Sequence, residues 1–172
     1  MRMTPEERSK LDEKRWLALA KLARPSIARA ISAAMKVTDC AISFADRSTT
    51  VQITELFVHR ARGTSYKNEV PTRSDAIQIA KAELGETEGP AYILPEDYHA
   101  CGVIPTDFAT AFEHLDALLA SQDETIRLIT ANGDTGLIIS TQESSHANFP
   151  RFITIWKPLD PGQLTWEGKE ET

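Results

Sequence analysis

The chain has 172 residues, a net charge of −6, and hydrophobic and charged fractions of 41% and 26%. This is the composition of an ordinary globular domain, so it excludes wholesale disorder, and two cysteines are too few for a secreted disulfide scaffold. No apolar run approaches the roughly eighteen residues of a membrane-spanning helix, and the charged start lacks the apolar segment of a signal peptide. We therefore expect a cytoplasmic protein with free thiols and no membrane association.

Charge is distributed unevenly along the chain. Residues 1–36 carry nine Lys or Arg against four acidic residues, whereas residues 75–134 carry twelve acidic residues against Lys81 and Arg127 alone. Blocks of like charge are ordinarily solvated faces, but an acidic surface can also complement a basic partner and accelerate its encounter. The same acidic body would repel the phosphates of a duplex, which argues against general nucleic-acid binding.

The first segment, residues 1–36, is expected to form a basic amphipathic helix pair. Thr4 is a helix-capping residue, Pro5 suits the first helical position, and Glu7 completes a capping box. Pro25 cannot continue the hydrogen-bond ladder, so a kink or a restart is predicted there. The apolar stripe of this segment can pack on the domain's own sheet or, alternatively, join two copies of the chain in a homodimer. The stripe consists of Trp16, Leu19, Ala20, Ala23, Ile27 and Ile31.

Two strands and a long loop are predicted next. Apolar residues alternate over residues 40–44, and residues 51–58 form a returning strand whose apolar phase shifts, as it does at a β-bulge. Residues 59–73 are polar and aperiodic, and loops of this length are often functional. Their basic side chains are candidates for anion or nucleic-acid binding, with Tyr66 available for stacking. These candidates are Arg60, Arg62 and Lys67.

The rest of the chain predicts short helices and strands in mixed order. The expected elements are a helix from Thr72 or Ser74 to Gly85, a strand at 91–94, an irregular stretch at 96–105, a helix at 106–119, a hairpin of 126–131 and 136–141 around Asn132-Gly133, a loop with His146 and Asn148, and a strand at 152–156. This order predicts a single α+β domain over residues 1–158, followed by a polar tail at 159–172. The sheet is expected to be mainly antiparallel, with about five or six strands and helices packed on one face.

One short segment carries residues capable of chemistry. If residues 96–105 are extended, Asp97, His99 and Cys101 project from the same side. A thiol beside an imidazole can become a nucleophile, which makes Cys101 the candidate nucleophile, His99 the base and Asp97 its orienting group. The same side chains are zinc ligands, but only His114 could add a fourth, and phosphate-cradling glycine loops are missing. We therefore expect no metal and no cofactor.

The leading functional hypothesis is a small protein-binding module, such as an inhibitor, an immunity-type protein or an assembly factor, that uses an acidic surface against a basic partner. The alternatives are a small-metabolite enzyme built on Cys101 and His99, and nucleic-acid binding through residues 60–67. The expected partner-binding residues are Glu83, Glu86, Glu88, Glu96, Asp97, Glu113 and Asp116.

Overall fold

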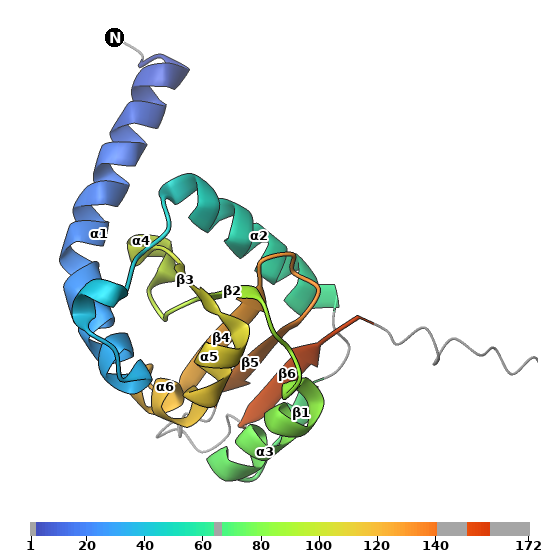
Figure 1. Ribbon diagram of the computed structural model, residues 1–172. Helices are drawn as coiled ribbons and strands as arrows, with labels where there is room; N and C mark the ends of the chain where they lie inside the picture. Colours follow the sequence, from blue (N-terminus) through green and yellow to red (C-terminus); the bar gives the residue numbers. More distant parts are fainter. Residues whose placement is uncertain (1–2, 64–66, 141–150, 159–172) are drawn as a thin grey trace, which may run out of the picture.

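The computed structural model of the chain describes residues 3–63, 67–140 and 151–158 (Figure 1). Its helices are α1 (Pro5–Met35), η1 (Asp39–Ala41), α2 (Arg47–Gly63), α3 (Arg73–Leu84), α4 (Tyr98–Cys101), α5 (Phe108–Glu113) and α6 (Leu115–Ser121). Its strands are β1 (Lys67–Glu69), β2 (Pro90–Ile93), β3 (Ile104–Asp107), β4 (Thr125–Thr130), β5 (Gly136–Ser140) and β6 (Phe152–Trp156). The predicted tail at 159–172 and loop residues His146 and Asn148 lie outside the described residues.

The strands form a six-stranded sheet in the order β1-β6-β5-β4-β2-β3, and each neighbouring pair is antiparallel. The predicted hairpin is confirmed, because β4 pairs directly with β5 and Leu128 lies opposite Leu137. Gly133, in the turn, has a φ of 76°, a left-handed conformation that glycine adopts without strain. The predictions of an α+β fold and an antiparallel sheet are therefore confirmed.

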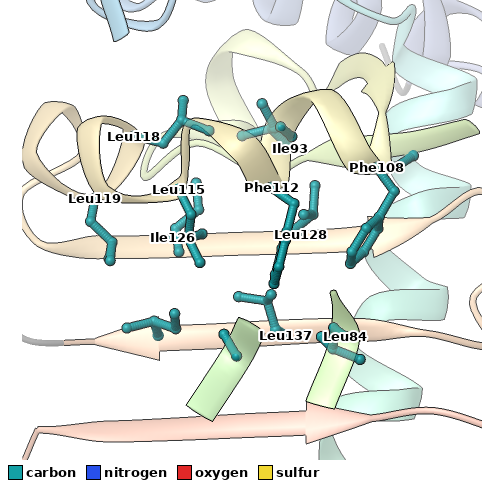
Figure 2. Packing of buried hydrophobic residues seen from close by; sticks show 14 of the residues in the cluster. Leu84, Ile93, Phe108, Phe112, Leu115, Leu118, Leu119, Ile126, Leu128 and Leu137 are labelled. Atoms are coloured by element: carbon teal, nitrogen blue, oxygen red, sulfur yellow. The ribbon is translucent and has the colours of Figure 1, made fainter. Parts of the chain in front are cut away.

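Helices cover both faces of this sheet. Ile126 and Leu128 of β4 contribute to the larger core, where α3, α5, α6 and the second half of α1 pack (Figure 2). Ile129, the residue after Leu128, points to the opposite face of the sheet and packs with Phe57 of α2 and Trp156. The expectation of helices on one face is thus wrong, because α2 forms a second layer that the sequence patterns did not indicate (Figure 1).

The two strands predicted over residues 40–58 are also wrong. Residues 39–41 form the 3₁₀ turn η1, and α2 begins at Arg47. The carboxylate of Asp46 accepts a hydrogen bond from the backbone N–H of Thr49 at 2.7 Å, as a capping residue does at a helix start. Ile53 and Phe57 are buried four residues apart on one side of this helix. The apparent shift of apolar phase was therefore helical periodicity and not a β-bulge.

The N-terminal segment is one continuous helix and not a helix pair. The predicted capping box between Thr4 and Glu7 is present, and Pro25 lies inside the helix. Proline removes only one backbone N–H, and the buried Ala20 and Ile31 hold the chain to the body on either side of it. The first half of α1 extends beyond the rest of the molecule (Figure 1).

The helix predicted at 106–119 is divided in two. β3 pairs with β2 up to Asp107, whose carboxylate then accepts from the Thr110 N–H and caps α5. α5 ends at Glu113, and α6 follows after His114. Both helices place leucines and phenylalanines over β4, as the apolar spacing predicted (Figure 2).

Candidate functional site

The segment with His99 and Cys101 is a turn of helix and not an extended strand. Successive residues in a helix are about 100° apart, so two residues separated by one position lie on nearly opposite sides. The Cys101 side chain is fully buried, with its Sγ donating to the Gly102 carbonyl at 3.3 Å. His99 is exposed, and its ring lies 4.0 Å from the Tyr98 ring. The structure does not bring the thiol and the imidazole together.

The electrostatics of Cys101 also oppose a nucleophilic role. Burial raises the pKa of its thiol to about 11, so the group stays protonated near neutral pH. His114 lies at the junction of α5 and α6. Across the described ranges, no group of three His, Cys, Asp or Glu side chains is arranged to hold a metal ion.

α4 instead holds the N-terminal helix in place. The indole Nε1 of Trp16 donates to the His99 carbonyl at 3.0 Å, and the Nε of Arg24 donates to the Cys101 carbonyl at 2.8 Å. The Arg24 guanidinium also lies over the rings of Trp16 and Phe44, at 5.2 and 5.1 Å from their centroids. Sequence reasoning missed this role of Arg24. The sequence feature that could have indicated this role is the position of Arg24, a basic residue eight positions after Trp16 on the apolar side of the helix.

The basic candidates do not form one loop. Arg60 and Arg62 lie in the last turn of α2, where cations stabilise the negative end of the helix macrodipole. The Arg60 guanidinium is 3.2 Å from the Asp134 carboxylate. Lys67 belongs to β1, and Tyr66 lies outside the described residues. The geometry gives Arg60 and Arg62 a structural explanation that requires no bound anion.

Five of the seven acidic candidates belong to the helical layer over the larger core. We name these five the acidic face, and each of them is exposed at the outer side of α3, α5 and α6 or of the link after α3. The layer is continuous, since Arg73 at the start of α3 donates to the Asp116 carbonyl and the Phe108 N–H donates to the Gly89 carbonyl at 2.8 Å. The acidic face consists of Glu83, Glu86, Glu88, Glu113 and Asp116.

Two carboxylates of the acidic face are already paired. Glu83 lies 2.7 Å from the Nζ of Lys157, and Asp116 lies 2.9 Å from the Nε of Arg73. Glu86, Glu88 and Glu113 make no ion pair within the described part of the chain. These three carboxylates are therefore available to a partner.

Glu96 and Asp97 do not belong to α3, α5 or α6, since they follow β2 and precede α4. With Asp123 they line a shallow hollow beside Ser26 of α1, which we name the acidic hollow. Partial burial and a hydrogen bond with Asp123 raise the pKa of the Glu96 carboxyl, the charges of Asp123 and Asp97 raise it further, and Arg127 opposes them. The predicted acidic set thus divides into five residues on the helical layer and two that line the acidic hollow.

Comparison with known proteins gave no match: no family model fits the chain, and no curated protein or solved structure is significantly similar to it. Among the described helices, none is both long and apolar enough to cross a lipid bilayer.

Proposed function

We propose that this chain is a protein-binding module of the inhibitor, immunity or assembly-factor class, and that it binds a basic partner through the acidic face. The observation that supports the proposal is that five exposed carboxylates belong to one helical layer, and that Glu86, Glu88 and Glu113 pair with no cation among the residues the structure describes. Opposite charge on a partner would steer its approach and exclude partners of the same sign. We further propose a cytoplasmic location, in keeping with two free cysteines.

The enzyme alternative on Cys101 and His99 has no support in the geometry, because one side chain is buried and the other faces water. For nucleic-acid binding through residues 60–67, the part of that segment that the structure describes offers no supporting contact, since Arg60 already faces Asp134. The acidic face therefore carries the proposal.

The proposal is tested by capture from a native lysate with the whole chain as bait, in low and in high salt. We expect one defined basic partner that high salt releases, because exposed charges are screened within about a Debye length. The double variant Glu86→Lys/Glu88→Lys removes two free carboxylates and should lose that partner.

A matched control has the same change of net charge elsewhere. Glu55 on α2 and Glu69 on β1 are exposed and lie outside the acidic face. Glu55→Lys/Glu69→Lys should retain the partner. Retention by the Glu86→Lys/Glu88→Lys variant, or capture that salt does not affect, would contradict the proposal.

A further inference from the structure

α1 exposes leucines on the side that faces away from the body. Leu22 is 80% exposed and Leu19 is 54% exposed, although the spacing predicted Leu19 on the buried stripe. Leu11, Ala18 and Leu22 fall within about 40° of one another around the helix, and Arg15 completes this row. We name Leu11, Arg15, Ala18 and Leu22 the outer seam. Leu11 is half-buried, whereas Arg15, Ala18 and Leu22 are exposed. Apolar rows that reach the surface of a folded protein mark interaction surfaces.

Contacts on the opposite side of α1 determine that the outer seam faces away from the body. Trp16 and Arg24 are hydrogen-bonded to carbonyls of α4, and Ala20 between them is buried. α1 therefore cannot rotate to bury its outer leucines against its own body. The outer seam stays available to another molecule.

Charge is segregated along the length of α1. Its first part, residues 5–13, contains four acidic residues against Arg8 and Lys10. The remaining part, residues 14–35, contains no acidic residue and five basic residues, of which Arg24 is already bound to α4 and the other four are Lys14, Arg15, Lys21 and Arg29. Two such helices side by side in the same direction would place like charges together, whereas opposite directions place the acidic part of each beside the basic part of the other.

We infer that α1 pairs antiparallel with α1 of a second copy of this chain, with Leu11 against Leu22 of that copy and Leu22 against its Leu11. The outer seam has the four-three-four spacing of a coiled-coil seam, and an antiparallel two-fold pair is self-complementary. In this register Ala18 lies opposite Arg15 of the second copy, close to the two-fold axis, where the small side chain of Ala18 leaves room for the arginine.

The acidic hollow fits the same register. Pairing Leu11 with Leu22 places Arg8 of the second copy opposite Pro25, adjacent to Ser26 at the edge of the hollow. Glu96, Asp97 and Asp123 line the hollow together with Ser26. The carboxylates that do not belong to the acidic face thus receive a cation from the second copy.

The dimer is tested by sedimentation equilibrium of the full chain over the micromolar range. A single helix pair buries less surface than a standard interface, so we expect a dissociation constant on the order of micromolar. Leu22→Asp should weaken the dimer about tenfold or more. Leu17→Asp is the matched control, because Leu17 is 50% exposed on the same helix but about 140° around it from Leu22.

The charge contribution has its own matched pair. Arg8→Glu should weaken the dimer. Lys10→Glu makes the same change of charge but should not weaken it, because Lys10 lies on the other side of the helix, where it pairs with Glu6. A wild-type chain that stays monomeric throughout the range overturns the inference. Equal effects of Leu17→Asp and Leu22→Asp overturn it as well.

Disulfide trapping in a Cys40→Ser background tests the direction of pairing. The double variant Leu11→Cys/Leu22→Cys should form covalent dimers, and each single variant should not, because identical positions are then about 16 Å apart along the helix. Cross-linking of the single variants would indicate a parallel pair and contradict the inference. The dimer does not depend on the proposed function: Glu86→Lys/Glu88→Lys should leave it intact, and Leu22→Asp should leave capture of the basic partner intact.

Discussion

The indole N–H of Trp16 donates a hydrogen bond to the backbone carbonyl of His99, 83 positions later in the chain. This bond, with the one from Arg24 to the Cys101 carbonyl, joins the projecting helix to α4. The α4 segment, which contains His99 and Cys101, therefore stabilises the fold through its backbone carbonyls. The same contact determines which side of α1 faces water.

Two substitutions of Trp16 should destabilise the protein by different amounts, because they remove different interactions. Trp16→Phe keeps a ring but removes the donor, and we expect a loss of about 1 kcal/mol in the free energy of unfolding. Trp16→Ala also removes the buried ring, and we expect a loss of about 3–5 kcal/mol. Urea denaturation measures both values. Equal losses for the two variants would show that the hydrogen bond, and not the packing, dominates.

The two cysteines should differ sharply toward alkylating reagents. Cys40 is exposed, whereas Cys101 is buried and its pKa is raised to about 11. In the native protein at neutral pH we expect modification of Cys40 only, with Cys101 modified after unfolding. Mass spectrometry of labelled peptides gives the ratio. Rapid labelling of native Cys101 below pH 7 would revive a catalytic role for it.

Much of the fold could be predicted from local patterns, and the failures have a common cause. The Thr4 capping box and the Asn132-Gly133 hairpin depend on neighbours in sequence, and both are present. Residues 49–58 are rich in β-branched side chains, which favour strands locally, yet burial of Ile53 and Phe57 against the sheet makes them helical. The candidate site was likewise only partly predictable. The position of Glu96 and Asp97 beside α1 is a tertiary contact, which the spacing of residues in the sequence does not reveal.

The carboxyl of Glu96 should lower stability at neutral pH. Its pKa is raised by partial burial and by Asp123, and an acid with a raised folded-state pKa costs stability when it is ionised. Glu96→Gln should therefore increase the free energy of unfolding at pH 7. The difference from wild type should shrink as the pH falls and Glu96 becomes protonated.

Asp46 provides a control of the opposite sign. The Thr49 N–H lowers the pKa of its carboxyl, so the ionised group stabilises the fold, and this stabilisation is lost as the pH falls through the lowered pKa. Asp46→Asn should reduce stability at pH 7 and make little difference in strong acid. Thermal melts over this pH range measure both variants. The account of the acidic hollow fails if Glu96→Gln behaves like Asp46→Asn.

Alanine substitutions at three glycines distinguish the cost of backbone strain from the cost of steric crowding. Gly102 has a φ of 96°, and an added Cβ would lie 3.0 Å from the Ala45 carbonyl oxygen and 3.1 Å from the Thr50 hydroxyl. Gly89 has a φ of 102° with nothing near, and Gly63 has open space without such a φ. Alanine should cost about 1–3 kcal/mol at Gly89 from strain, more at Gly102, and little at Gly63. Chemical denaturation of the three variants checks this order, and a neutral Gly102→Ala would contradict it.

The most direct test of the acidic face is the association rate of the captured partner as a function of ionic strength. For the wild-type chain we predict a rate that falls steeply with salt while dissociation changes little, since exposed charges act mainly on encounter. Glu86→Lys/Glu88→Lys should slow association at low salt and flatten its salt dependence, and Glu55→Lys/Glu69→Lys should do neither. A rate that is independent of salt, or an equal change in both variants, would contradict the central claim.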